Sequence, residues 1–349
     1  MMPAFIRPAS VQFRTALTAI LVLLMLAGCG TAGSNEAPAS AQGGGQEKVV
    51  IHIGVQGKTG IFPYARDKRY FEQAFEKVGV EVQWTEFQSG PPHFEALASN
   101  RLDFGAVGGT PVVSGQVGGV DFKAVAVTSD GKKGNFIVVP KDSPIRRLED
   151  LRGAKIGVAK GSSAYNFLFM ALARGGLKGD DIKLIQLQPD EARPALDSGA
   201  IDAWSIWEPY ATTAVFQSGA KSLVSGQDLN INAPGFLVAR TSFLEKHPDL
   251  AVLFLKTYEE ARRYFVDHLD EVAADISRTQ KLDLEITKTV LSNADPILSP
   301  VTPEFAKAHQ EQADFLFNEG AIGKKLDTSE VFENKYVEQA LKELQENGR

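Results

Sequence analysis

The stretch KIGVAKGSSAYNFLFMALARGG, residues 155–176, decides the fold class of this chain. Its first four residues, with the β-branched Ile156 and Val158, form a short run of the kind that makes a strand. A Gly-Ser-Ser turn at 161–163 then leads into a helical pattern that continues to Ala173. The glycine pair at 175–176 ends that helix, and either serine of the turn can cap its start. A strand that passes through a glycine turn into a helix is the repeating unit of an α/β fold.

The same strand–helix alternation runs through most of the chain and falls into two blocks. The first block has strands near 49–55, 80–87 and 102–107 and a helix over 64–78, and the second continues the pattern to about 232. A strand at 235–239 and the helices from Thr241 onward can return to the first block. We therefore predict two βα lobes built on parallel sheets, lobe 1 from 48–139 plus 233–349 and lobe 2 from 140–232. Two crossings between the lobes form a two-strand hinge and leave a ligand cleft.

The N-terminal residues have the pattern of an export signal. Arg7 and Arg14 precede an apolar run over 16–27, which is shorter than the roughly 20 residues that cross a bilayer. Leu26-Ala27-Gly28-Cys29 follows and resembles the bacterial lipobox, in which the chain is cut before the cysteine and the cysteine carries lipid. We predict a lipoprotein signal peptide over 1–28 and lipidation of Cys29. The small polar residues that follow predict a flexible linker over 29–47.

Composition excludes several classes of protein. Removal of residues 1–28, which carry two arginines and no acid, changes the formal charge from −6 to −8. An acidic chain is not typical of a nucleic-acid binder, which needs a basic face. Cys29 is the only cysteine, so an internal disulfide is impossible and the fold depends on its apolar cores.

The sequence offers no pattern of a catalytic or metal centre. The five histidines are scattered, and none has a metal-binding spacing such as H-E-x-x-H. No G-x-S-x-G elbow and no complete phosphate-binding loop occurs. His52 lies on a predicted strand, where a packed side chain is the simpler interpretation. We predict no metal, no cofactor and no catalytic residue.

Groups that bind small anions are the better prospect. Ser162 and Ser163 precede a helix whose free N–H groups and positive dipole end attract negative charge. Gly109-Thr110 repeats this arrangement in the first block, and Gly90-Pro91 and Gln56 also follow strand ends. Ligands of open α/β sheets lie at that edge, so we expect these groups to meet around one anion.

Trp204 and Trp207 flank the end of a predicted strand and precede Glu208. Residues i and i+3 of an extended chain point to opposite faces, so one tryptophan is expected in the core and the other in the cleft. A cleft tryptophan can cover an apolar ligand tail. Glu208 can bind an ammonium group or pair with a cation.

An ordered set of motifs over residues 49–240 resembles the aliphatic-sulfonate-binding proteins of ABC importers. It comprises Ile53-Gly54-Val55-Gln56, Gly90-Pro91, Asp103-Phe104-Gly105, Gly109-Thr110-Pro111, Val139–Ile145, Leu148–Lys155, Gly161–Ala164 and Asp202–Tyr210. The same superfamily includes binders of taurine, nitrate, aromatic acids, riboflavin and thiamine precursors. Two departures concern the ligand: Gly109 stands where an acid usually precedes Thr-Pro, and Glu208 stands where Asp usually precedes Pro-Tyr.

The resemblance implies a periplasmic-binding-protein type II fold that closes over its ligand. It implies capture of a small organic anion, with sulfonate or taurine favoured, and delivery to an ABC permease with its ATPase. With the lipobox-like signal, we expect an exported, lipid-anchored monomer. The ligand would contact Gln56, Gly90, Pro91, Gly109, Thr110, Ser162, Ser163, Trp204, Trp207 and Glu208. Three alternatives stay open: a binder of a heterocycle such as riboflavin or a thiamine precursor, a sensor or adhesive surface protein, and an enzyme.

Overall fold

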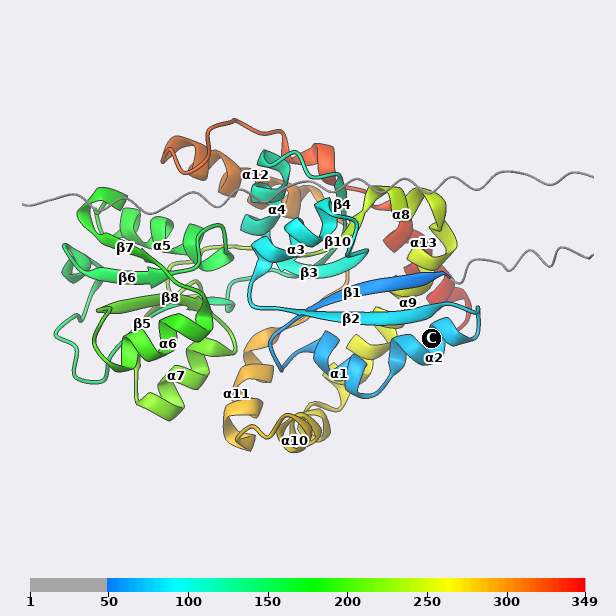
Figure 1. The fold of residues 1–349 in the computed structure, drawn as a ribbon, viewed down its shortest axis with the longest axis horizontal. Coiled ribbons are helices and arrows are strands. Elements are labelled where there is room, and N and C mark those ends of the chain that lie inside the picture. The colour runs from blue at the N-terminus through cyan, green and yellow to red at the C-terminus, as the bar shows by residue number, and fades with distance from the viewer. Residues whose placement is uncertain (1–48, 349) are drawn as a thin grey trace, which may run out of the picture. The chain divides into compact units, whose positions relative to one another are not determined.

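Two five-stranded mixed sheets form the framework of the protein (Figure 1). The computed structural model describes residues 49–348. The strands of the first sheet, in the order β2-β1-β3-β10-β4, are Glu81–Phe87, Val50–Gln56, Phe104–Gly108, Gly235–Arg240 and Phe122–Ser129. Those of the second, in the order β7-β6-β8-β5-β9, are Lys183–Gln186, Lys155–Val158, Ala203–Trp207, Asn135–Val139 and Lys221–Ser225.

Helices follow most of these strands, as the alternation in the sequence predicts. Those before β10 are α1 (Ile61–Asp67), α2 (Tyr70–Glu76), α3 (Gly90–Ala98), α4 (Gly109–Val117), α5 (Ser163–Arg174), α6 (Pro189–Asp197) and α7 (Tyr210–Ser218). The later ones are α8 (Thr241–Lys246), α9 (Pro248–Asp267), α10 (Leu269–Gln280), α11 (Leu284–Ala294), α12 (Pro303–Asn318) and α13 (Lys335–Glu346). Short 3₁₀ turns occur at Leu148–Leu151, Gly179–Asp181 and Thr328–Val331.

The prediction of all-parallel sheets is wrong in one strand of each sheet. β1, β2 and β3 are parallel, but β10 enters between β3 and β4 and is antiparallel to both. In the second sheet, β5 is antiparallel to its neighbours β8 and β9. Each of these two strands, β5 and β10, is the first strand after the chain crosses from the other sheet. The expected return of the strand near 235–239 to the first sheet is confirmed by β10.

The two crossing segments lie against each other. Residues 130–134 join β4 to β5, residues 226–234 join β9 to β10, and the Ala233 N–H donates to the Asp130 carbonyl at 3.1 Å. A Cβ added at Gly131 would lie 1.7 Å from the Ala233 carbonyl oxygen, so only glycine fits at this crossing. This pair of adjacent connections is the arrangement that the sequence predicts for a two-strand hinge.

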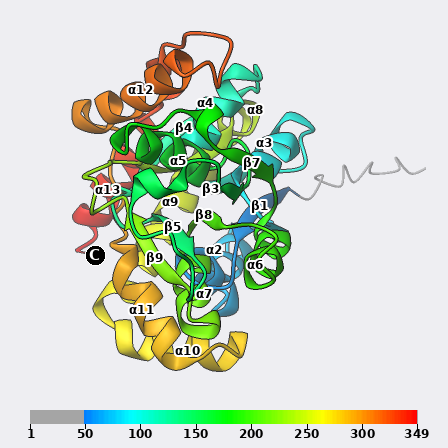
Figure 2. The same ribbon diagram turned by 90° about the vertical axis from the view of Figure 1, so that its left-hand side faces the viewer.

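Two segments differ from the predicted boundaries between the blocks. The prediction assigns residues 48–139 to lobe 1, whereas β5 pairs within the second sheet. It also assigns 233–349 to lobe 1, whereas Ala313, Leu316 and Leu326 belong to the hydrophobic core beside the second sheet. Helix α12 therefore packs on both cores, because its first half contacts the first-sheet side through Phe305 and Ala306. Figure 2 shows α12 on one side of the structure and α10 and α11 on the other.

The predicted helix over 64–78 is two helices. Arg69 has φ of 60°, a left-handed conformation that breaks the hydrogen-bonded ladder between α1 and α2. Helix α9 contributes aromatic side chains to the core: Phe254 and Phe265 are fully buried, and the Phe254 ring stacks on Phe104 with 3.9 Å between centroids.

The predicted signal peptide over 1–28, the linker over 29–47 and the lipidated Cys29 lie outside the described residues. Within residues 49–348, no helix has the length and apolar character needed to cross a membrane.

Candidate functional site

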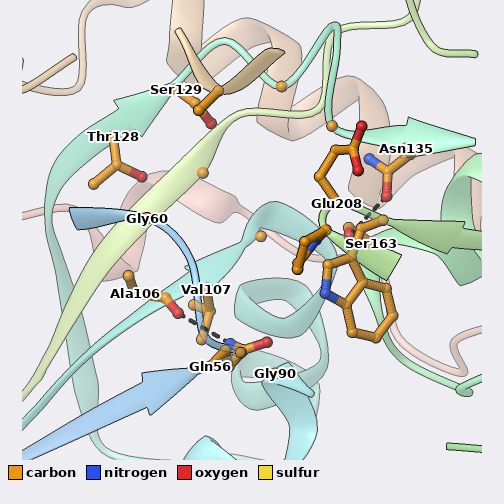
Figure 3. A pocket seen from close by; sticks show the side chains of 18 of the residues that line it. Gln56, Gly60, Gly90, Ala106, Val107, Thr128, Ser129, Asn135, Ser163 and Glu208 are labelled. Atoms are coloured by element: carbon orange, nitrogen blue, oxygen red, sulfur yellow. Dashed lines mark hydrogen bonds between the residues drawn. The ribbon is translucent and has the colours of Figure 1, made fainter. Parts of the chain in front are cut away.

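A cavity of about 300 Å³ lies where strand ends of both sheets face each other. Its walls include the ends of β1, β3, β4 and β8, the first residue of β5 and the N-terminal turn of α5. Figure 3 shows Gln56 and Gly90 on one side of this space, Asn135, Ser163 and Glu208 on another, and Thr128 and Ser129 on a third. The cavity is thus at the strand edge where open α/β sheets bind ligands.

The N-terminus of α5 supplies two hydroxyls with different tasks. Ser162 is the N-cap, and its Oγ accepts a hydrogen bond from the Tyr165 N–H at 3.3 Å. Ser163 begins the helix, and its Oγ donates to Asn135 Oδ1 at 2.9 Å. Both residues line the cavity. The first N–H groups of a helix have no acceptor within the helix, so this end presents donors and a positive dipole to the cavity.

A second helix N-terminus meets the first. Gly108 is the N-cap of α4 and lines the cavity. A Cβ added at Gly108 would lie 2.9 Å from Ser163 Cβ, so the starts of α4 and α5 are in direct contact although they follow different sheets. The predicted meeting of two helix N-termini, one from each block, is therefore present.

Neutral side chains complete the polar wall. Gln56 at the end of β1 donates from Nε2 to the Ala106 carbonyl at 3.0 Å, which fixes the amide against β3 (Figure 3). Asn135 accepts from Ser163, and its Nδ2 group carries two further N–H donors. Among the described residues that line the cavity, none is Lys, Arg or His, so the hydrogen-bond donors of this wall are neutral side chains and backbone N–H groups.

Within the part of the chain that the structure describes, Glu208 is the one acidic side chain that lines the cavity, and its carboxylate accepts three hydrogen bonds from protein groups. Oε1 accepts from Thr212 Oγ1 at 2.7 Å and from Asn293 Nδ2 at 3.0 Å. Oε2 accepts from the Thr212 N–H at 3.1 Å, within the first turn of α7. The carboxylate therefore joins the start of α7 to the end of α11.

The two tryptophans separate as the alternation of a strand requires. Trp204 is 1% exposed and packs in the core under β8 with Leu196, Ile201 and Ala211. Trp207 lines the cavity, and its ring lies perpendicular to Tyr210 at 5.9 Å between centroids. Burial, followed by the nearby charge of Asp190, raises the pKa of the Tyr210 hydroxyl, so Tyr210 remains a neutral donor.

Ten residues are predicted to bind ligand, and six of them line this cavity: Gln56, Gly90, Ser162, Ser163, Trp207 and Glu208. The other four lie elsewhere. Pro91 packs near Gly161, and Trp204 lies in the core. Thr110 is 2% exposed within α4, and Gly109 faces α12, where an added Cβ would lie 2.6 Å from Gln312 Oε1. An acidic side chain at 109 would collide with Gln312 in this packing.

Several lining residues are missing from the sequence prediction. Thr128 and Ser129 end β4, and Tyr210 starts α7. A search for polar residues after every predicted strand would have found the first two. Val290, Leu291 and Ala294 come from α11, far along the chain, and no local pattern distinguishes them from core residues.

Histidines lie apart from the cavity lining. His52 forms a hydrogen bond through Nδ1 with Asp103 Oδ2 at 3.2 Å, and Asp103 also pairs with Arg240. His93 is buried against the backbone of β1 and β3, where a Cβ at Gly105 would lie 2.5 Å from its Cδ2. Within residues 49–348, no group of three or more His, Cys, Asp or Glu side chains is arranged to hold a metal ion.

Comparison with known proteins supports the same fold and family. The NMT1-like family matches residues 44–278. The chain is 43% identical to the "Putative aliphatic sulfonates-binding protein" of Bacillus subtilis over 94% of this chain and 97% of the relative. It is similar to two solved structures. One is the alkanesulfonate-binding protein SsuA of Xanthomonas axonopodis pv. citri bound to MOPS (TM-score 0.78, 26% identity), with 82% of this chain and 98% of that chain covered. The other is the periplasmic aliphatic sulphonate binding protein SsuA of Escherichia coli (TM-score 0.70, 31% identity), with 81% and 91% covered. The chain has the periplasmic-binding-protein fold, and it belongs to the NMT1-like family.

Proposed function

We propose that this chain is the solute-binding protein of an ABC importer and that it captures a small organic anion of the sulfonate class. The observation that carries the proposal is the contact between the N-termini of α4 and α5 at the cavity wall. A sulfonate has one negative charge and three acceptor oxygens. Helix N–H groups and the remaining amide N–H groups of Gln56 and Asn135 supply donors to such a group without a cation, and the Ser163 hydroxyl holds the Asn135 amide in place.

The names of relatives favour the same ligand class. Proteins of Bacillus subtilis and Escherichia coli at 43% and 34% identity carry the name "Putative aliphatic sulfonates-binding protein". A third relative, 30% identical over 55% of this chain, is the taurine-binding periplasmic protein of Escherichia coli. We extend this binding role to the present chain, with aliphatic sulfonate or taurine as ligand.

The rest of the proposal concerns where and how the protein acts. We infer that residues 1–28 direct export, that lipid on Cys29 anchors the protein, and that it acts outside the cytoplasm as a monomer. The sheets would form two lobes that close on the ligand about the paired crossings at 130–134 and 226–234. The closed form would deliver ligand to a membrane permease driven by a separate ATPase. We expect binding without turnover.

A ligand panel tests the proposal. Residues 30–349 are melted with taurine, alkanesulfonates, nitrate, aromatic carboxylates, riboflavin and thiamine precursors. A ligand at a hundredfold excess over Kd raises the free energy of unfolding by about 2.7 kcal/mol, and hence raises Tm. Sulfonates are expected to give this shift. A shift with heterocycles alone would overturn the anion assignment and keep a binding role, and chemical conversion of any ligand would identify an enzyme.

A further inference from the structure

The buried face of helix α12 carries two polar side chains among its apolar ones. His309 and Gln312 are 0% and 2% exposed, and Ala313 and Leu316 continue the same face at helical spacing. A buried polar side chain costs free energy unless it forms hydrogen bonds, and apolar residues would fill this face without that cost. Neither His309 nor Gln312 lines the cavity at the N-termini of α4 and α5, so contact with a ligand does not account for them.

The amide of Gln312 contacts two separate segments that form the wall of this cavity. Its Nε2 donates to the Asn232 carbonyl at 3.0 Å, and the next residue of that crossing segment, Ala233, lines the cavity. Its Oε1 lies 2.6 Å from the place that a Cβ of Gly109 would take, so it packs directly against the first residue of α4. The residue before it, Gly108, lines the cavity as the N-cap of α4. One amide therefore supports two parts of the wall from behind.

The start of α4 is closely enclosed on this side. His309 Nδ1 and the Pro234 carbonyl oxygen lie 3.0 Å and 3.1 Å from the same Cβ position at Gly109. The His309 ring in turn packs edge-on against Phe236 of β10, with 4.9 Å between ring centroids. Because Gly109 has no side chain, the polar groups of α12 reach the backbone of α4. Helix α12 thus connects the start of α4 with the end of the crossing segment, and it lies beside α4 in Figure 1.

We propose that Gln312 is a positioning residue of the anion site. Its amide fixes the N-terminus of α4 relative to the crossing segment 226–234, and so sets where the N–H groups of this helix end stand toward the ligand. The inference rests on the proposed function and adds to it a residue outside the cavity lining. Hydrogen bonds depend steeply on distance and angle, so a small shift of α4 is expected to weaken binding. Helix α12 packs on both cores, which gives the amide a firm support.

A purely structural role for Gln312 is the competing explanation, and Gln310 of the same helix provides the comparison. Gln310 Nε2 donates to the Leu326 carbonyl at 2.9 Å, and its Oε1 accepts from the Thr328 N–H at 2.9 Å. Neither of these partners lines the cavity. Replacement of either glutamine by methionine keeps a long unbranched side chain and removes its hydrogen bonds. Both changes are expected to lower Tm, but only the change at Gln312 is expected to alter ligand affinity.

The experiment measures Kd for ethanesulfonate by calorimetry, and Tm without ligand, in the wild type, Gln312→Met and Gln310→Met. Gln312→Met is expected to weaken binding about tenfold, the equivalent of one hydrogen bond. Gln310→Met is expected to lower Tm and to keep the wild-type Kd. An unchanged Kd in Gln312→Met, or the same loss of affinity in Gln310→Met, would overturn the inference and leave sulfonate binding intact. Failure of the wild type to bind any sulfonate would overturn both.

Gly109→Ala tests the same contact from the side of α4. The added Cβ would displace the Gln312 amide, so this variant is also expected to weaken binding about tenfold. The double variant with Gln312→Met should then bind no more weakly than either single variant, because both changes remove one interaction. Losses that add would show that the two residues act separately and would overturn the inference.

Amide NMR spectra of the ligand-free protein give a readout that loss of stability alone would not change. Gln312→Met is expected to shift the resonances of Gly108 and Ala233, which stand in the two supported parts of the wall. Gln310→Met is expected to leave both resonances in place. Shifts confined to α12 in the Gln312→Met spectrum would show that Gln312 supports only its own helix, which would overturn the inference.

Discussion

Asn293 Nδ2 donates a hydrogen bond to Glu208 Oε1 at 3.0 Å and so connects the end of α11 with the residues after β8. The second partner of this oxygen is the hydroxyl of Thr212, which is buried. One carboxylate therefore organises the start of α7 and holds α11 over the cavity. An acidic residue at a proposed anion site is explained by this bridging role.

Loss of the bridge is expected to lower stability in proportion to the number of donors left unpaired. Asn293→Ala removes one hydrogen bond to a partly exposed carboxylate and should cost about 1–2 kcal/mol. Glu208→Ala also leaves the N–H and the hydroxyl of Thr212 without their acceptor, and it should lower the free energy of unfolding by about 2–3 kcal/mol. Urea unfolding measures both. Ser292→Ala on the exposed side of α11 is the neighbouring control, and a Glu208→Ala variant as stable as this control would contradict the bridge.

The two serines at the start of α5 are expected to affect different properties. Ser162→Ala removes the cap hydrogen bond to Tyr165 and should cost about 1 kcal/mol of stability. Ser163→Ala removes the hydroxyl that holds the Asn135 amide at the cavity wall and should weaken sulfonate binding about tenfold, which corresponds to about 1.4 kcal/mol. Calorimetry and urea unfolding of both variants separate the effects. The reverse pattern would show that Ser162 is the ligand contact.

Trp204 is expected to affect the stability of the protein, and Trp207 is expected to report ligand binding through its fluorescence. Trp204→Ala empties a fully buried site and should cost about 3–5 kcal/mol. Trp207→Phe keeps an aromatic ring in the cavity wall but removes its indole fluorescence, so the emission change on sulfonate addition should disappear. Trp84 and Trp204 remain as emitters in that variant. Persistence of the full ligand-dependent change would place the responsive tryptophan elsewhere.

Membrane attachment is expected to depend on Cys29. A protein with an intact signal should fractionate with membranes in a bacterial host and incorporate labelled fatty acid, since more than one acyl chain gives stable anchoring. Cys29→Ser should abolish the label and move the protein to the soluble extracytoplasmic fraction. A soluble unmodified protein with Cys29 in place would show an ordinary secretory signal.

Local sequence patterns correctly predict the features of this protein that are set by residues close together in the sequence. The turn at 161–163 identifies β6 and α5, and the strand-end rule places Gln56, Gly90 and Ser163 at one cavity. Strand alternation requires Trp204 and Trp207 to face opposite ways, but it does not say which one faces the core. That choice depends on the elements that cover each face.

Contacts between residues far apart in the sequence account for the wrong or missing predictions. Antiparallel β5 and β10 pair with strands distant in the sequence, and no residue pattern within them specifies direction. Thr110 belongs to a helix start that does reach the site, but the phase of α4 turns its side chain into the interior. The α11 wall comes from more than 70 residues after the last motif used to define the site.

Two buried histidines are expected to make stability fall in mild acid. Burial lowers the pKa of His93 and of His309 from 6.5 to about 4. Between these values the unfolded chain binds more protons than the folded protein, so the free energy of unfolding decreases as pH falls through this window. Each histidine lowers the free energy of unfolding by about 1.4 kcal/mol for each pH unit that the pH falls, which is roughly 3 kcal/mol per histidine over the whole window. Above pH 6.5 neither histidine reduces the stability.

Urea unfolding between pH 7 and pH 4.5 tests this dependence. Hydrogen bonds from Lys68 and Lys256 lower the pKa values of Asp275 and Glu343, respectively, so the stability that these carboxylates contribute begins to fall only near their ordinary pKa values, at the acid end of this window. His309→Leu replaces a side chain packed against Phe236 and should halve the pH slope. The exposed His268→Gln is the control. An unchanged slope in His309→Leu would mean that the proton is taken up elsewhere when the chain unfolds.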